Sequence, residues 1–382
     1  MVGRSRGLLA LLAALLVLAG CASFPDGGPH DWRDKIEGVG ELGGPPAAAR
    51  PPTQEPPPPP DPAESGAPRA PSGCVDPDPQ VVATCLAPVG AIAVLPDGVS
   101  ALVGERATGR VLRVRQGAPA VLVTTIPVDA TGGGGLTGLV LSPAYAEDQL
   151  VYAYITTPTD NRVVKLAAGE PPKPVLVGIP RGAQHNAGAM GVDADGLLLV
   201  ATGDSGEDSA LPGSLAGKVL RIDTLGRPGT GNPDPRSPVL SSGVDNPAGL
   251  CVDDTTALAW VPDRTDDGDT LHLVAPGALP APAWRWPDRP GVAGCAAHDG
   301  VITVAQTFGS ATYVLRADRN GLFSGQPQTL LKGVYGRLGP AAMGPDGFLW
   351  LGTVNKNGGK PVSSDDRVIR IQVGGGGGAG RA

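Results

Sequence analysis

Charged residues are scarce in this sequence, and nothing in it resembles a basic stripe. Asp, Glu, Lys and Arg make up 18% of the 382 residues, and the net charge is −7. Nucleic acid is therefore excluded as a partner, because the phosphate backbone needs clustered Lys and Arg. The 58 Gly and 42 Pro residues are typical of a loop-rich β protein with low-complexity segments, and they argue against a helical bundle.

The apolar run near the N-terminus is too short to cross a bilayer of about 30 Å. It spans residues 8–18, follows Arg4 and Arg6, and leads directly into Ala19-Gly20-Cys21. This pattern predicts a secretory signal peptide at residues 1–20. Small residues before a cysteine match the bacterial lipobox, so we expect acyl chains on Cys21 to anchor the protein at the outer face of the cell membrane. An ordinary signal peptide followed by an incidental cysteine is the alternative.

Cysteine is also rare, with four residues left after Cys21. Export implies an oxidising compartment, and four cysteines allow three pairings. We favour Cys74–Cys85, which would close a short loop at the start of the folded domain, and Cys251–Cys295, which would link neighbouring repeats. The competing interpretation is a metal site, but no C-x-x-C spacing and no nearby histidine supports it.

Two low-complexity segments flank a repetitive region. Residues 21–73 contain the lipobox cysteine and then many prolines without a hydrophobic period, which predicts an extended, disordered tether. Residues 374–382 form a Gly-rich tail that we also expect to be disordered. Residues 74–373 are left as the folded domain.

The folded region repeats one pattern six times: a turn, often Asp-Gly, an apolar strand, and a second strand that often ends in Arg or Lys. The copies lie at residues 95–114, 141–166, 195–222, 252–274, 298–316 and 345–371. Spacing of roughly 45–60 residues is expected when each repeat is a four-stranded blade. The sequence therefore predicts an all-β, six-bladed β-propeller, with a β-sandwich of irregular repeats as the alternative.

One loop carries unusual polar residues, and propellers usually bind ligands at loops around the channel mouth. His185 is one of only four histidines and lies just before the third blade, and Asp204 follows the next strand. A carboxylate that fixes the imidazole tautomer would leave the other ring nitrogen free to accept a proton. Spacing alone favours the alternative, in which His185 caps a turn and Asp204 binds backbone N–H groups.

Several motifs resemble those of the soluble glucose/sorbosone dehydrogenases, in the same order and over residues 90–372. They are Gly132–Pro143 (family pattern G-x-x-G-L-L-G-x-x-x-x-P), His185–Gly188 (H-N-G-G), Gly203-Asp204 (G-T-G-D), Gly217–Asp223 (G-K-[IV]-L-R-I-[DN]), Asn246–Leu250 (N-P-Q-G-L) and Trp286-Pro287 (G-W-P). The whole layout, lipobox included, resembles that of a mycobacterial lipoprotein.

The resemblance implies a six-bladed propeller that oxidises a sugar hydroxyl by hydride transfer to pyrroloquinoline quinone (PQQ) in the presence of Ca²⁺. It further implies that His185 is the base, that Asp204 orients it, and that Asn246 and Arg337 bind the cofactor. No metal-ligating residue is assigned.

The sequence departs from the family at several cofactor-binding positions. Asp245 stands where the family has Arg, Gly133 replaces a Gln, Gly339 replaces an Arg, and residues 306–309 offer no Lys. Losing charge-assisted contacts should weaken PQQ binding. Two functions therefore stay open: a PQQ-dependent sugar dehydrogenase, or a non-catalytic propeller that binds a sugar, a cell-envelope ligand or a protein. A lactonase-like propeller would need a converging Glu/Asn/Asp set, which the sequence does not reveal.

Other acidic, aromatic and basic residues are weaker indications of a functional site. Four acids lie where the family supplies Ca²⁺ ligands and could hold a hard cation, although a solvated acidic loop is the commoner explanation. They are Asp263, Asp266, Asp267 and Asp269. Trp284 and Trp286 could stack on a sugar, although blade packing is the commoner explanation, and Arg106 and Arg110 are assigned to strand ends.

Overall fold

The computed structural model describes residues 71–206, 209 and 213–372. The expected signal peptide, Cys21, nearly all of the tether and the Gly-rich tail lie outside these residues. Among the residues described, no helix is long and apolar enough to cross a membrane.

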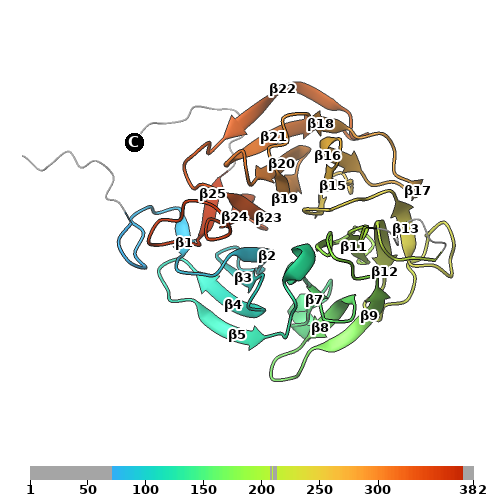
Figure 1. Cartoon of the computed structure of the whole chain (residues 1–382), viewed down its shortest axis with the longest axis horizontal. Helices are drawn as coiled ribbons and strands as arrows, with labels where there is room; N and C mark the ends of the chain where they lie inside the picture. The colour runs from blue at the N-terminus through green and yellow to red at the C-terminus, as the bar shows by residue number, and fades with distance from the viewer. Residues whose placement is uncertain (1–70, 207–208, 210–212, 373–382) are drawn as a thin grey trace, which may run out of the picture. The chain divides into compact units, whose positions relative to one another are not determined.

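Six antiparallel sheets, called blades 1 to 6 below, are arranged in chain order around a centre (Figure 1). Blade 1 contains β2 (Val89–Val94), β3 (Ser100–Glu105), β4 (Arg110–Arg115) and β5 (Val121–Thr125), and blade 2 contains β6 (Leu136–Leu141), β7 (Val151–Thr156), β8 (Asn161–Leu166) and β9 (Lys173–Ile179). Blade 3 contains β10 (Gly188–Val192), β11 (Leu198–Thr202), β12 (Lys218–Ile222) and β13 (Val239–Ser242), and blade 4 contains β14 (Cys251–Val252), β15 (Ala259–Thr265), β16 (Gly268–Leu273) and β18 (Trp284–Trp286). Blade 5 contains β19 (Val292–His298), β20 (Val301–Gln306), β21 (Ala311–Ala317) and β22 (Phe323–Leu330), and blade 6 contains β23 (Leu338–Met343), β24 (Phe348–Thr353), β25 (Val368–Gln372) and β1 (Val81–Ala83).

The predicted six-bladed propeller is confirmed, and the β-sandwich alternative is wrong. Three short elements complete the domain: η1 (Thr131–Gly133), α1 (Tyr145–Asp148) and β17 (Gly277–Ala278). The strand β17 pairs parallel with the outer strand β13 of blade 3, although it comes from the chain segment of blade 4.

The ring closes where the two ends of the described chain meet. Strand β1 pairs with β25, with Val81 opposite Ile369, so the first strand completes the last blade. Arg367 and Asp76 add a buried ion pair at 3.1 Å across the same closure. Each blade keeps its own short inner edge, and the radial arrangement of the blades protects these edges.

Turn chemistry explains the hairpins that the repeat predicts. In the first repeat the Asp97 carboxylate accepts hydrogen bonds from the backbone N–H groups of Val99, at 3.1 Å, and Ser100, at 2.9 Å. The next residue, Gly98, has a φ of 68°, which glycine adopts without strain. The inner strands then approach the axis closely, because a side chain at Gly294 of β19 would collide with Pro340 and Ala341 of β23.

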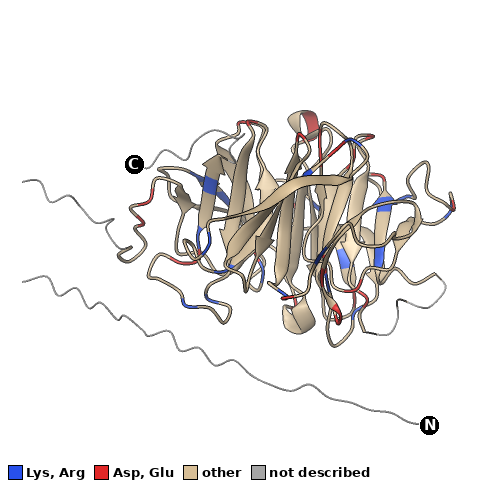
Figure 2. Cartoon of the chain, turned by 90° about the horizontal axis from the view of Figure 1, so that it is seen from above, with Lys and Arg blue, Asp and Glu red and all other residues tan. Residues whose placement is uncertain are grey.

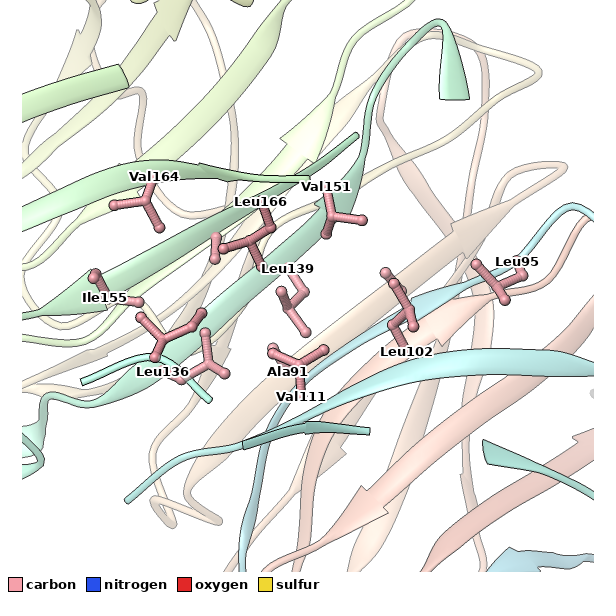
Figure 3. Packing of buried hydrophobic residues seen from close by; sticks show 13 residues of the cluster. Ala91, Leu95, Leu102, Val111, Leu136, Leu139, Val151, Ile155, Val164 and Leu166 are labelled. Carbon is pink, nitrogen blue, oxygen red and sulfur yellow. The ribbon is translucent and has the colours of Figure 1, made fainter. Parts of the chain in front are cut away.

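Apolar strands pack blade against blade, as the continuous apolar runs in the sequence predict. Between blades 1 and 2, Ala91, Leu102 and Val111 contact a set that includes Leu136 and Ile155 (Figure 3). Leu136 is fully buried in this layer. Much of the strand surface carries no charge, and acidic and basic residues lie mainly in loops and on outer strands (Figure 2). The apolar core between neighbouring blades therefore holds the strands in place, and charged side chains that could act on a ligand lie mainly in the loops.

Both predicted disulfides are present. Cys74 pairs with Cys85, and Cys251 pairs with Cys295. The second bond joins the inner strands β14 and β19 of blades 4 and 5, as the repeat alignment predicted.

Candidate active site

The site lies where the six inner strands begin, at one mouth of the central channel. A cavity of about 250 Å³ opens there, and we call it the mouth cavity. Every blade contributes to its lining, including Arg106, Thr137, Gly188, Arg264, Thr307 and Asn357 from blades 1 to 6 in order. Backbone from converging strands and a few polar side chains make up its wall, as is usual for a ligand site.

The opposite end of the channel differs in chemistry. Its cavity, of about 420 Å³, is lined by the carboxyl ends of the inner strands, including Val94, Leu141, Val192 and Met343, and no charged side chain lines it. Charged side chains therefore line the mouth cavity and not this end of the channel.

His185 and Asp204 meet beside the mouth cavity. His185 Nδ1 lies 2.7 Å from Asp204 Oδ1, and the two side chains are 26% and 21% exposed. An ionised carboxylate can only accept here, so the neutral ring donates a hydrogen bond from Nδ1–H and Nε2 keeps its lone pair. Asp204 also accepts a hydrogen bond from the Gly206 backbone N–H at 2.9 Å, so the alternative role considered from the sequence is present as well. The chain continues from His185 into Ala187 and Gly188, which line the cavity.

A buried amide holds the histidine loop in shape. Asn186 is fully buried, donates hydrogen bonds to the carbonyls of Gly132 (3.0 Å) and Gly182 (2.8 Å), and accepts one from the Gly182 N–H at 2.9 Å. His185 itself adopts a φ of 57°, a conformation that costs a non-glycine residue free energy. Asn186 offsets this cost by satisfying the backbone around the turn. The sequence interpretation missed this role.

The dyad is also fixed from the side of Asp204. Its backbone N–H donates to the Asp245 carbonyl at 2.8 Å, and the Gly203 N–H donates to the Ala187 carbonyl at 3.2 Å. A side chain at Gly203 would collide with the carbonyl of His185. Glycine is therefore required where the β11 end passes under the histidine loop.

Carboxylates gather behind the dyad. The buried Asp263 accepts hydrogen bonds from the backbone N–H groups of Asp245 (2.9 Å) and Asn246 (2.7 Å). Burial raises the pKa of Asp263 to about 7, and the charges of Asp245 and Asp204 act in the same direction. Burial and the neighbouring Asp204 likewise raise the pKa of Asp245, while His185 opposes the shift. Negative charge on these carboxylates would stabilise a positively charged His185 ring in front of them.

Two arginines supply positive charge on the cavity wall. Arg106 Nε donates to the Gly134 carbonyl at 2.9 Å, and Arg264 Nε donates to the Val292 carbonyl at 2.6 Å. Burial lowers the pKa of both guanidinium groups, and Arg106 lowers that of Arg264 further. Both still carry a charge at neutral pH. The sequence pattern predicted a strand-end role for Arg106 and gave no prediction for Arg264. An arginine at the end of an apolar strand is the feature of the sequence that could have indicated both residues.

The two predicted cofactor-binding residues are separated. Asn246 lines the mouth cavity, whereas Arg337 lines a neighbouring pocket with Tyr335 and Asn355. Arg337 donates to the Asn357 carbonyl at 2.7 Å, and its guanidinium carbon lies 5.4 Å from the centre of the Phe308 ring. Arg337 is thus directed to the rim of the mouth and not to its lining.

The acidic loop is engaged in structural hydrogen bonds. Besides the contacts of Asp263, the buried Asp269 accepts from the backbone N–H groups of Gly291 (2.6 Å) and Val292 (2.8 Å). Asp266 and Asp267 are exposed. Within the described part of the chain, no three His, Cys, Asp or Glu side chains are grouped to hold a metal ion.

The remaining singled-out residues have structural contacts. Trp284 and Trp286 form an edge-to-face pair with ring centres 6.4 Å apart, and Trp286 lies 5.4 Å from Tyr313. Arg110 lies 3.3 Å from the buried carboxylate of Glu105. These contacts agree with blade packing for the tryptophans and a strand-end role for Arg110.

Comparison with known proteins places this geometry among relatives. A family model described as glucose/sorbosone dehydrogenase matches residues 87–288. The PQQ-bound aldose sugar dehydrogenase of Streptomyces coelicolor is 33% identical, with a TM-score of 0.71 over 76% of this chain and 96% of that one. A putative oxidoreductase (glucose dehydrogenase) of Thermus thermophilus is 31% identical, with a TM-score of 0.69 over 76% and 98%. The soluble aldose sugar dehydrogenase of Escherichia coli is 19% identical (TM-score 0.64, over 76% and 98%) and shares the fold. The comparison with curated proteins returned no match.

Proposed function

This chain belongs to the glucose/sorbosone dehydrogenase family, and from that premise we propose that it oxidises a sugar hydroxyl, with His185 as the base. The observation that carries the proposal is the 2.7 Å contact between His185 and Asp204 beside the mouth cavity. It gives a ring nitrogen that can take the hydroxyl proton in a partly exposed position that a substrate can reach.

The cavity wall suits PQQ, a flat quinone that bears three carboxylates. Arg106 and Arg264 would hold its carboxylates, since guanidinium groups match them in charge and geometry. Asn246, on the same wall, would donate a further hydrogen bond. When bound, PQQ supplies the acceptor for the hydride.

The protein groups handle the proton. In the neutral ring, Asp204 holds the proton on Nδ1, so that Nε2 presents its lone pair to the hydroxyl, and Asp204 then stabilises the positive ring once Nε2 has taken the hydroxyl proton. The partly buried Asp245 and the buried Asp263 add negative charge behind the ring. General-base catalysis of this kind contributes about 10²- to 10⁴-fold in rate.

A matched pair of histidines tests the proposal. Reconstituted with PQQ and Ca²⁺, the protein should reduce a redox dye in the presence of an aldose, and His185→Ala should lower kcat about 10²- to 10⁴-fold. His298 forms a similar pair with Asp254, at 2.9 Å, but lies outside the mouth cavity. His298→Ala should keep full activity. Equal losses in both variants, or none in either, would count against His185 as the base.

We also propose that the domain works at the outer face of the cell membrane, held by lipid on Cys21. The lipobox and the Pro-rich tether support this location. Labelled palmitate should be incorporated into the wild-type protein and not into Cys21→Ala, which should be recovered from the soluble fraction. Label in the variant would show that Cys21 is not the acylated residue.

The alternative function is a propeller that binds a ligand without catalysis. It is favoured by Asp245, a half-buried carboxylate close to the dyad, which would repel an anionic cofactor. Titration with PQQ separates the two functions. Saturable binding with a change in quinone absorbance supports the dehydrogenase, and no binding at high micromolar cofactor supports the binding module.

A further inference from the structure

We propose that Arg264 and Arg106 form a two-sided carboxylate site that binds PQQ without a divalent cation, so that Arg264 takes over the role of a metal in neutralising the ligand. The inference rests on the proposed function for the identity of the ligand. The site itself rests on the geometry of the cavity.

The two guanidinium groups come from opposite sides of the mouth. Arg106 follows β3 of blade 1 and Arg264 belongs to β15 of blade 4, blades that face each other across a six-membered ring. Both side chains line the same cavity of about 250 Å³. A ligand bound between them would therefore face a positively charged guanidinium group on each side.

Backbone contacts fix both guanidinium groups and leave donors over. Among the described residues, Arg106 forms a hydrogen bond only through Nε, which donates to the Gly134 carbonyl. In Arg264, Nε binds the Val292 carbonyl and one terminal nitrogen reaches Thr307 Oγ1 at 3.3 Å. The remaining N–H groups are held in a set orientation, which lowers the entropic cost of binding a carboxylate.

Within the described residues neither guanidinium group is in a salt bridge, although the charge of Asp269 acts on Arg264. In the described chain, no carboxylate lies within 4.0 Å of either guanidinium group, whereas most other arginines have such a partner. Burial lowers the pKa of both groups; for Arg264 the charge of Asp269 opposes this shift and that of Arg106 adds to it. Partly buried cations without a close counter-ion cost free energy, and an anion bound between them lowers that cost.

The neighbouring acids are poorly suited to attract a divalent cation to the same place. Asp263 and Asp269 already accept two backbone hydrogen bonds each. Arg264 follows Asp263 in β15, so a fixed positive charge stands beside the acidic residues where the family resemblance would place Ca²⁺ ligands. Coulomb repulsion opposes a second cation there.

The test is a titration of PQQ into the full mature protein in detergent, followed by quinone absorbance and calorimetry, with excess EDTA or with Ca²⁺. We expect the same Kd, within about twofold, in both conditions. Arg264→Gln should weaken binding by about 10- to 100-fold, the loss expected for a charge-assisted contact. Arg236→Gln removes a charge from a 91% exposed side chain outside the mouth cavity and should leave the Kd unchanged.

PQQ binding that EDTA abolishes and Ca²⁺ restores would overturn the inference. This comparison uses the wild-type protein alone. An unchanged Kd in Arg264→Gln would overturn it too. If that variant does not fold, as judged by circular dichroism, Arg106→Gln makes the same test from the other wall.

A second probe separates this inference from the proposed function. Benzene-1,3,5-tricarboxylate carries three carboxylates but no quinone. Suppose that it binds the wild-type protein and not Arg264→Gln, while no sugar is oxidised with PQQ. The arginine site would then be supported and the dehydrogenase function contradicted. If sugar oxidation occurs but PQQ binding requires Ca²⁺, the dehydrogenase function is supported and the cation-independent arginine site is contradicted.

Discussion

At the scale of single residues, the candidate site is a histidine whose neighbours fix its orientation. Asp204 fixes the tautomer of His185, and the buried Asn186 holds the strained turn that presents it. In the proposed reaction few groups would touch the substrate, and the residues around them hold those groups in position. Two predictions belong to this scale.

Replacing the orienting carboxylate should cost activity without unfolding the protein. Asp204→Asn is expected to lower kcat by about 10²- to 10⁴-fold, because the amide no longer fixes the proton on Nδ1. The pH–rate profile should change with it, which a purely structural defect would not produce. Asp254→Asn, in the pair with His298, is the control and should behave like the wild type. An unaltered pH profile in Asp204→Asn would contradict the assigned role.

The buried Asp263 should make stability depend on pH. Its folded-state pKa of about 7 exceeds the ordinary value of 3.8, so the folded protein binds this proton more tightly than the unfolded chain. Stability should fall as pH rises from 4 to 7, by up to about 1.4 kcal/mol per pH unit from this group. Urea unfolding across this range should show a smaller slope in Asp263→Asn than in the wild type. Identical slopes would mean that Asp263 titrates normally in the fold.

At the scale of elements, the hairpins were predictable and the contacts between loops were not. Turns such as Asp97-Gly98 and the apolar strands after them repeat along the sequence, so local propensity and the fold agree. Arg106 and Arg264 share a cavity only because blades 1 and 4 face each other after ring closure. Their separation in sequence hid this, and the family motifs directed attention to Arg337 instead.

The histidine loop should be sensitive to the glycine beneath it. In Gly203→Ala the added methyl group would collide with the His185 carbonyl, so the loop must shift. We expect a loss of about 1–3 kcal/mol in the free energy of unfolding, together with lower kcat. Gly117→Ala is the control, because a methyl group there meets no atom within 4 Å, although its φ of 74° adds some strain. Full activity in Gly203→Ala would show that the loop tolerates the shift.

At the scale of the whole propeller, closure gathers side chains from six blades at one mouth. The β1–β25 pairing joins the chain ends, and the Cys251–Cys295 disulfide links blades 4 and 5 near the axis. Small displacements of these blades would separate Arg264 from the residues opposite. Ring integrity is therefore a condition for the site as well as for stability.

Removing the central disulfide should weaken the ring. The bond spans 44 residues, and the double variant Cys251→Ser/Cys295→Ser should lose about 2–4 kcal/mol of unfolding free energy in urea. PQQ affinity should fall in parallel, since Arg264 belongs to blade 4. Unchanged stability in the double variant would show that packing alone holds these blades.

The most direct test of the account is an experimental structure of the protein with PQQ and an aldose. We predict that the quinone lies in the mouth cavity, that its carboxylates contact Arg106 and Arg264, and that a sugar hydroxyl lies within hydrogen-bond distance of His185 Nε2. A ligand bound away from His185, or a mouth cavity that stays empty at saturating cofactor, would contradict it.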